Sequence, residues 1–160
     1  MVLKILNNIL DFIYPNKCVF CDEVMPLNEK DGICKYCYSD IDFIIGDKEP
    51  NLSVFCYDDI TRHSILRLKY YNRRDYAKVF GRMMYNKLLK YDYIICVPMY
   101  IKKKKKRGYD QAELIAEELS KLCGIPIEKD NLIRNRDTLP QSKVSFEERA
   151  KNVEGVFEIV

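Results

Sequence analysis

Four cysteines near the amino terminus have the spacing of a metal site. Cys18 and Cys21 form one C-x-x-C pair, Cys34 and Cys37 form a second, and 12 residues separate the pairs. In such a pair the backbone turns so that both sulfurs reach one ion, and two pairs complete a tetrahedral zinc site with Zn–S bonds of about 2.3 Å. All four positions would be filled by protein, so we predict a structural zinc. A dithiol redox centre and cysteines without a shared role are the alternatives.

The segment that carries these cysteines, residues 16–39, has too few aliphatic side chains for a core of its own and needs a crosslink. Before it, the apolar spacing from Val2 to Ile13 predicts an amphipathic helix that Pro15 ends. Polar residues interrupt this run and no small-residue cleavage site follows, so we do not interpret it as a signal peptide and we place the protein in the cytoplasm. Thiols stay reduced there. Three further cysteines have apolar neighbours, which predicts buried side chains: Cys56, Cys96 and Cys123.

A run of basic residues forms a second candidate site. It follows an apolar segment, Tyr93 to Val97, and precedes a helix with Asp110 as its N-cap and Glu113 as the reciprocal capping partner. The apolar segment predicts a strand buried on both faces, and a loop between such a strand and a helix is where α/β sheets bind anions. A solvated charge run and a general nucleic-acid patch are the alternatives. The residues of this predicted anion site are Lys102, Lys103, Lys104, Lys105, Lys106, Arg107, Gly108, Arg134 and Arg149.

Strands and helices alternate after Leu52, which predicts an α/β domain with a largely parallel sheet. The predicted strands are Ser53 to Tyr57, Tyr93 to Val97, Leu132 to Arg134 and Gly155 to Val160. The predicted helices are Thr61 to Lys69, Tyr76 to Leu89, Asp110 to near Gly124, and Phe146 to Lys151. We therefore divide the chain into an N-terminal helix and zinc module, residues 1–50, and an α/β domain, residues 51–160.

Length and charge limit the functions that the chain can have. With 160 residues and 48% hydrophobic composition, it is globular and too small for a multidomain machine. Its apolar runs fall short of the roughly 20 residues that cross a bilayer, so we expect no membrane span. The net charge of +3 combines −6 over residues 1–60 with +9 over residues 61–160. The second part is therefore where we expect a phosphate-rich partner or substrate.

Several motifs together resemble the ComF family of competence-associated, phosphoribosyltransferase-like proteins, in particular its ComFC branch. They occur in the family's order along nearly the whole chain. The motifs are Tyr14-Pro15, the paired cysteines, Leu68-Lys69-Tyr70, Val97-Pro98, Arg107-Gly108-Tyr109-Asp110-Gln111, Arg134 with Thr138 and Gln141, and Arg149-Asn152-Val153 before Phe157.

The resemblance implies a zinc-ribbon-like module followed by a type I phosphoribosyltransferase fold, a Rossmann-like sheet domain. It also implies a role in the uptake of transforming DNA. By analogy with enzymes of that fold, the segment from Val97 to Arg107 would face pyrophosphate, with Arg107, the nearby lysines and Gln111 as anion ligands. Magnesium would be needed only if phosphoribosyl transfer is retained.

The chain departs from the family pattern in two places. Asp110 stands where the family has Asn, which keeps the N-cap but adds negative charge beside the proposed anion site. The family's apolar strand with two acidic residues and a Thr-Thr-Gly loop, which binds phosphoribosyl pyrophosphate, does not occur before Val160. We therefore interpret the chain as a shortened member with an incomplete sheet, and the sequence leaves open whether it is an enzyme.

Three functions follow, in this order of preference. The first is a zinc-stabilised ComF-type protein that supports DNA uptake and natural transformation, with single-stranded DNA and other competence proteins as partners. The second is a non-catalytic, zinc-stabilised interaction module. The third is a phosphoribosyltransferase acting on phosphoribosyl pyrophosphate, in which positioned cations would stabilise the departing pyrophosphate.

Overall fold

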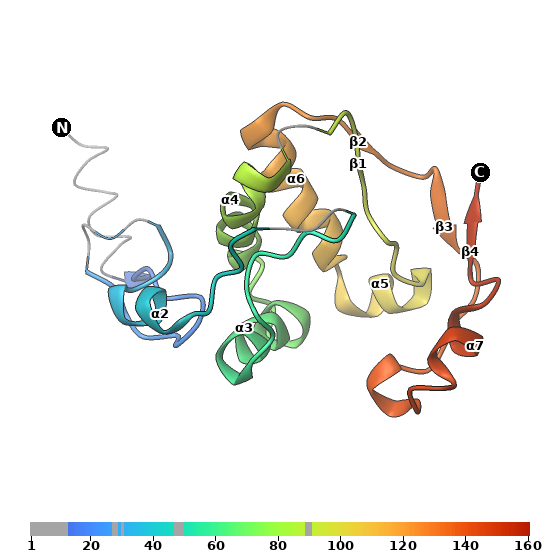
Figure 1. Ribbon diagram of the computed structural model, residues 1–160, viewed down its shortest axis with the longest axis horizontal. Helices are drawn as coiled ribbons and strands as arrows, with labels where there is room; N and C mark the ends of the chain where they lie inside the picture. The colour runs from blue at the N-terminus through green and yellow to red at the C-terminus, as the bar shows by residue number, and fades with distance from the viewer. Residues whose placement is uncertain (1–12, 27–28, 30, 47–49, 89–90) are drawn as a thin grey trace.

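The computed structural model describes the chain except residues 1–12, 27–28, 30, 47–49 and 89–90 (Figure 1). The predicted helix from Val2 to Ile13 therefore lies almost wholly outside the described residues. The helices are α2 (Lys35–Asp40), α3 (Asp59–Tyr70), α4 (Tyr76–Leu88), α5 (Ile101–Arg107), α6 (Gln111–Cys123), the 3-10 turn η1 (Gln141–Lys143) and α7 (Arg149–Val153). The strands are β1 (Ile94–Ile95), β2 (Ile127–Glu128), β3 (Leu132–Arg134) and β4 (Phe157–Ile159).

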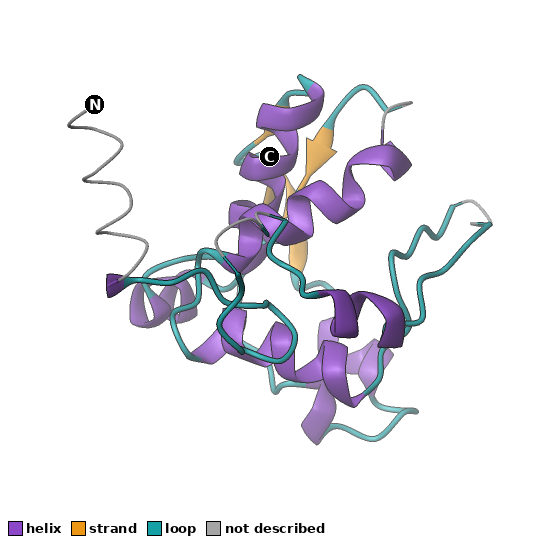
Figure 2. Cartoon of the chain, turned by 90° about the vertical axis from the view of Figure 1, so that its left-hand side faces the viewer, coloured by secondary structure: helices purple, strands orange, loops and turns teal. Residues whose placement is uncertain are grey.

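Helices and loops make up most of the molecule, and the strands are short (Figures 1 and 2). The closest helix pair is α4 with α6, and Gly81 allows that approach. A Cβ atom at Gly81 would lie only 3.1 Å from Glu118 Cβ and from the Leu119 backbone nitrogen. In Figure 1, α2 lies on the left, α3 and α4 lie near the centre, and α5, β3, β4 and α7 lie on the right.

The strands form two separate two-stranded sheets in place of the single, largely parallel sheet that we predicted. Strands β1 and β2 are parallel, with Ile94 opposite Ile127, whereas β3 and β4 are antiparallel, with Ile133 opposite Glu158. The prediction that the Tyr93 to Val97 segment is buried on both faces is wrong. Ile95 and Val97 are 56% and 65% exposed.

Local sequence signals account for three long helices, all predicted within a few residues. In α3 the N-cap Asp58 forms a capping box with Thr61, which donates its hydroxyl to Asp58 and accepts from the Asp58 backbone. In α6 the Asp110 carboxylate accepts from Ala112 N–H at 2.9 Å and from Met99 N–H at 2.8 Å, which fixes the preceding segment as well. Glu113 is not the reciprocal capping partner that we predicted, because it pairs with Lys104.

Two local predictions are wrong. Residues 53–57 contribute only a single β-bridge, between Phe55 and Phe43, and no strand. The lysine run is the helix α5 and not a loop. Lysine has good helix propensity, the basic side chains at the end of α5 complement the helix dipole, and Gly108 closes the helix in the left-handed conformation at φ 82°.

One buried cluster joins the cysteine-rich segment to the helices. It contains Cys18, Val19 and Phe20 from the first segment and Leu68, Tyr76, Ala77 and Phe80 from α3 and α4. Phe20 contacts Phe55 and Phe80 edge to face, with ring centroids 5.9 and 6.3 Å apart. The two predicted parts of the chain thus share a core, and their division at residue 50 stays a prediction.

The prediction that the three remaining cysteines are buried is also wrong. Cys56 is exposed, and Cys96 and Cys123 are half-buried. Cys56 follows a single β-bridge, Cys96 follows the two-residue strand β1, and Cys123 is the last residue of α6. Among the described residues, none of the helices has the length and apolar character needed to cross a membrane.

Candidate metal centre and cationic cleft

The four predicted metal ligands come together. The Sγ atoms of Cys18, Cys21, Cys34 and Cys37 all lie within 4.8 Å of one another. The Sγ atoms of Cys21 and Cys34 are 3.8 Å apart, and a tetrahedron with Zn–S arms of about 2.3 Å has edges of about 3.8 Å. All four cysteines are free thiols. The spacing is therefore too wide for disulfides and fits four sulfurs around one ion.

Tight turns position the sulfurs. After Cys18 the chain reverses through Asp22, whose backbone is left-handed at φ 65° and whose N–H donates to the Cys18 carbonyl at 2.9 Å. Cys34 is the N-cap of α2, so its sulfur accepts from the Cys37 backbone N–H at 3.4 Å. The Cys34 N–H in turn donates to the Cys18 sulfur at 3.4 Å. These N–H groups point at sulfur and favour thiolates there.

The electrostatics of the cluster favour a bound cation. Burial acts to raise the pKa of the Cys18 thiol, but backbone hydrogen bonds from Cys34, Cys21 and Phe20 outweigh it and the pKa is lowered. Burial raises the pKa of Cys37, and the neighbouring cysteines raise it further. The cluster thus accepts one negative charge readily and resists more. A divalent ion supplies the missing positive charge, and an all-sulfur donor set suits zinc and not magnesium.

Polar side chains from α3, from α4 and from the loop between them hold the first cysteine turn in place. Ser64 Oγ donates to the Val19 carbonyl at 2.5 Å, and Arg67 Nη1 donates to the Phe20 carbonyl at 2.8 Å. The Asp22 carboxylate accepts from Arg73 and from the Tyr76 hydroxyl. Because these acceptors lie within the Cys18–Asp22 turn, α3 and α4 fix the position of half of the ligand set.

A second feature is a cleft of about 840 Å³. Its walls come from the end of α3, from α5 and α6, from residues 138–141 and from β4. Five cations line it, and none of the described residues that line it is a carboxylate. The cationic lining consists of Lys69, Lys103, Lys106, Arg107 and Arg134.

The cations of the cleft differ in how they are held. Arg107 donates to the Gln111 side chain and stands over the Tyr70 ring, 5.1 Å from its centroid. Arg134 donates to the Thr138 hydroxyl, while its buried Nε has no acceptor among the described residues. Lys103 pairs with Asp137 at 2.5 Å. The buried, unpaired Nε of Arg134 is a donor that an anionic ligand could satisfy.

The structure separates the predicted anion site into two sets. Lys103, Lys106, Arg107, Gln111 and Arg134 line the cleft. The remaining members do not line it: Lys102, Lys104, Lys105, Gly108 and Arg149. Helix periodicity explains the split within α5, because residues 103, 106 and 107 share one face at i, i+3 and i+4 spacing.

Two predicted members outside the cleft have other contacts. Lys104 pairs with Glu113 at 2.5 Å, and the Arg149 guanidinium lies 5.8 Å from the Phe146 ring centroid. Our sequence prediction missed three residues that line the cleft: Lys69 and Tyr70 at the end of α3, and Asn72 just beyond it. The Leu68-Lys69-Tyr70 segment carried part of the family resemblance, and that was the available signal for them.

Comparisons with known proteins agree with the first site. Residues 9–50 match the family model described as a double zinc ribbon domain. With the clustered sulfurs, this match indicates a zinc ribbon in this part of the chain and suggests a structural zinc.

The chain is also similar to Competence protein F of Haemophilus influenzae (strain ATCC 51907 / DSM 11121 / KW20 / Rd). The two are 28% identical over 104 residues, which cover 59% of this chain and 45% of the relative. The chain thus spans less than half of the length of that relative. No solved structure matches, so the phosphoribosyltransferase-like sheet stays a prediction. These similarities support the resemblance to the ComF family that the sequence motifs indicated.

Proposed function

We propose that this ComF-like protein supports DNA uptake, that zinc at Cys18, Cys21, Cys34 and Cys37 stabilises it, and that its cationic cleft binds nucleic-acid phosphates. The observation that carries the cleft proposal is its charge: five cations surround about 840 Å³ and no described lining residue is a carboxylate. The name of the relative, Competence protein F, supports the link to DNA uptake and to other competence proteins as partners. We place this role in the cytoplasm, where reduced thiols are available to hold zinc.

The zinc would act as a crosslink. It would join the turn at Cys18 and Cys21 to the start of α2, and with all four positions filled by sulfur it has no position for a reacting water. Side chains of the protein hold the module in place beside the helices. Ser64 and Arg67 hold the backbone of the first turn, and Phe20 packs into the shared core. We propose that residues 1–50 and 51–160 are distinct modules that need this crosslink to stay docked.

In the cleft, phosphate recognition would rest on three groups from different elements. Arg107 is held by Gln111, so its guanidinium is oriented before a ligand arrives. Arg134 offers its unpaired Nε. Tyr70 is 66% exposed beside Arg107 and gives a flat surface on which an unpaired base can stack. The combination favours single-stranded nucleic acid over duplex.

Two double variants on α5 test the cleft. We expect Lys106→Gln with Arg107→Gln to weaken binding of a short labelled single-stranded oligonucleotide about tenfold, measured by fluorescence anisotropy. The salt dependence of log K should become shallower by about 1.4, because two phosphate contacts are lost. The matched control, Lys102→Gln with Lys105→Gln, removes the same charge from exposed positions outside the cleft. Equal weakening in both variants would show diffuse attraction and would overturn the cleft.

Phosphoribosyl pyrophosphate offers the same phosphate chemistry to the cleft and is the second candidate ligand. Its transfer chemistry needs carboxylates to hold magnesium and the ribose hydroxyls. The described lining residues include none. We therefore expect binding without turnover, so incubation with phosphoribosyl pyrophosphate, magnesium and purine or pyrimidine bases should release no pyrophosphate. Measured release would restore the enzymatic function.

A further inference from the structure

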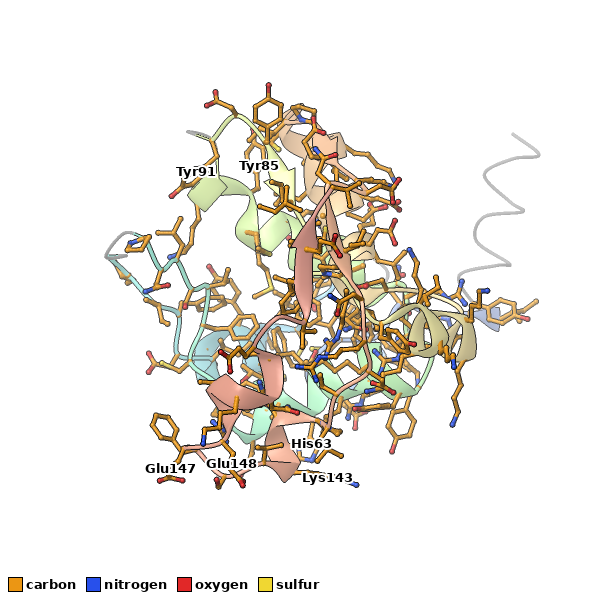
Figure 3. The ribbon with its side chains drawn as sticks, turned by 90° about the vertical axis from the view of Figure 1, so that its right-hand side faces the viewer. His63, Tyr85, Tyr91, Lys143, Glu147 and Glu148 are labelled. Atoms are coloured by element: carbon orange, nitrogen blue, oxygen red, sulfur yellow. The ribbon has the colours of Figure 1, made fainter. Side chains whose placement is uncertain are left out.

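A groove of about 640 Å³ lies beside the cysteine cluster, between the cysteine turns and the beginning of α3. Apolar side chains form much of its lining, and two large ones are exposed there. Val24 is 58% exposed and Tyr36 is 69% exposed. His63, labelled toward the lower end of the molecule in Figure 3, also lines it. The groove is separate from the cationic cleft, since the two features share no lining residue.

Carboxylates surround this apolar surface. They are Glu23, Glu29, Asp40 and Asp59. Within the described part of the chain none of them forms an ion pair, and Oε2 of Glu29 is buried without a hydrogen-bond donor. Four thiolates around one divalent ion would add net negative charge. The groove thus combines an apolar floor with an unneutralised anionic rim.

The two cations of the groove balance only two of its four carboxylates, so two negative charges remain in excess. Arg67 donates to the Phe20 carbonyl and is committed to the cysteine turn. Lys35 lies over the Tyr36 ring, 5.1 Å from its centroid. This excess of negative charge in the groove agrees with the net charge of −6 over residues 1–60. A nucleic acid would be repelled here, whereas a cationic polypeptide would be attracted and could also cover the apolar surface.

We propose that this groove docks a lysine- or arginine-rich segment of a partner protein, with an apolar side chain of that segment seated between Val24 and Tyr36. A second copy of this chain fits less well. Its basic helix α5 already uses Lys103 and Lys104 in pairs with Asp137 and Glu113. The proposal concerns a different surface from the cleft and does not depend on the proposed function.

The position of the groove gives the proposal a functional consequence. Four residues of α3 line the groove, from Asp59 in the first turn to Arg67, whereas Lys69 and Tyr70, at the end of the same helix, line the cleft. A helix of 12 residues is about 18 Å long. A partner held at one end of α3 would therefore leave the other end free to bind nucleic acid. The groove would place a cationic partner next to DNA without competing for the same side chains.

The test uses the full-length, zinc-loaded chain and a labelled synthetic peptide in which lysines flank a pair of leucines. We expect binding by fluorescence anisotropy at low salt and weaker binding as salt rises. Replacing the lysines by glutamates should abolish it. Replacing the leucines by serines should weaken it about tenfold, because the apolar seat is lost. If the serine peptide binds as well as the leucine peptide, the apolar part of the proposal is wrong.

Matched variants locate the peptide. Glu23→Gln with Asp59→Asn removes two charges from the groove and should weaken peptide binding about tenfold. Glu147→Gln with Glu158→Gln removes two charges from exposed positions, one just before α7 and one in β4, that do not line the groove, and should leave peptide binding unchanged. Equal losses in both variants, or no binding at low salt, would overturn the proposal.

Sedimentation analysis of the chain without peptide tests whether a second copy of the chain occupies the groove. We expect a monomer in both the unmodified chain and the groove variant. Self-association that the Glu23 and Asp59 substitutions abolish would assign the groove to a second copy of the chain and overturn the partner proposed here. Zinc content, measured on every variant, should be unchanged, because none of the substituted residues is a cysteine.

Discussion

The cysteine cluster and the cationic cleft are built in opposite ways. Two of the four cysteines are buried, Cys18 fully and Cys37 nearly so, and hydrogen bonds from Ser64 and Arg67 of α3 hold the backbone of the cluster. The cleft is an open surface between segments that contact one another little. In its far wall, from residue 131 to the end of the chain, Val156 is the one buried residue.

This difference predicts two kinds of response to change. A site that shares its side chains with the core fails as a unit, because losing one ligand also removes part of the packing. A site made of surface cations from separate elements loses affinity in steps, roughly one contact at a time. The cluster should therefore govern stability, and the cleft should govern binding.

The largest expected effect is the loss of one sulfur ligand. Cys37→Ser should abolish stoichiometric zinc binding and with it the cooperative unfolding of the cysteine-rich segment, because metal affinity and folding are coupled at such sites. We expect at least about 4 kcal/mol of lost stability. Zinc content by atomic emission and thermal unfolding by circular dichroism measure both quantities.

The matched control is Cys123→Ser, at the end of α6. This half-buried cysteine lies outside the cluster, so its substitution should leave zinc content unchanged. Removal of zinc from the unmodified chain with a chelator should reproduce the Cys37→Ser result. A metal-free chain with the same thermal transition as the loaded one would contradict the structural role of zinc.

A packing change should damage the same region without touching a ligand. Gly32 has a φ of 80°, and a Cβ atom there would lie 2.3 Å from a methyl group of Val79 on α4. Gly32→Ala should therefore cost about 3 kcal/mol, combining left-handed backbone strain with overpacking. Gly46 has a similar φ of 83°, but no atom of the described residues lies within 4 Å of its added Cβ.

Gly46→Ala should therefore cost only about 1 kcal/mol, the backbone part alone. Chemical denaturation of both variants gives the difference, which isolates the contact between the cysteine-rich segment and α4. Zinc should remain bound to both at saturating metal. Equal destabilisation by the two substitutions would mean that the segment does not pack on α4 at Gly32.

The contrast between the two sites also explains what the sequence could predict. The four ligands lie within 20 consecutive residues, from Cys18 to Cys37, so their spacing was sufficient to predict that they meet. The cleft collects Lys69, Arg107 and Arg134 from three separate segments. No local sequence pattern predicts that these three residues meet, because their approach depends on how the helices pack.

Errors in the fold have the same origin. The helices α3, α4 and α6 were predictable from apolar spacing and caps, which are local signals. Strand pairing is not local, and β3 with β4 is antiparallel where we predicted a parallel sheet. We predict a loop for the lysine run from its charge, but lysine also has good helix propensity and the run is helical. Recognised as a helix, its i, i+3, i+4 face would have selected Lys103, Lys106 and Arg107.

A smaller effect is expected from the aromatic surface of the cleft. Tyr70→Leu keeps an apolar side chain of similar reach but removes the ring beside Arg107. We expect oligonucleotide affinity to fall about fivefold through lost stacking, with unfolding unchanged because Tyr70 is exposed. Tyr71→Leu is the matched control, since Tyr71 is 72% exposed and does not line the cleft. Equal losses at both positions would remove Tyr70 from the binding surface.

The smallest expected effect is a pH dependence next to the cleft. Lys104 lies 2.5 Å from Glu113, and Lys129 lies 3.5 Å from it. The hydrogen bond from Lys104 lowers the pKa of Glu113, and the charges of Lys104 and Lys129 act in the same direction. The charge of Asp110 instead acts on the other partner, helping to raise the pKa of Lys104, for which the hydrogen bond to Glu113 is the main cause.

A lowered pKa in the folded state means that Glu113 stabilises the fold above its ordinary pKa, and that this contribution is lost as pH falls through the lowered value. For a partly exposed pair it should be below about 1 kcal/mol. Urea unfolding at pH about 7 and about 3 should show a smaller loss of stability in Glu113→Gln than in the unmodified chain. The exposed Glu147→Gln should behave like the unmodified chain. Parallel pH curves for all three would mean that the pair does not hold α5 against α6, and the cationic face of α5 would then need another support.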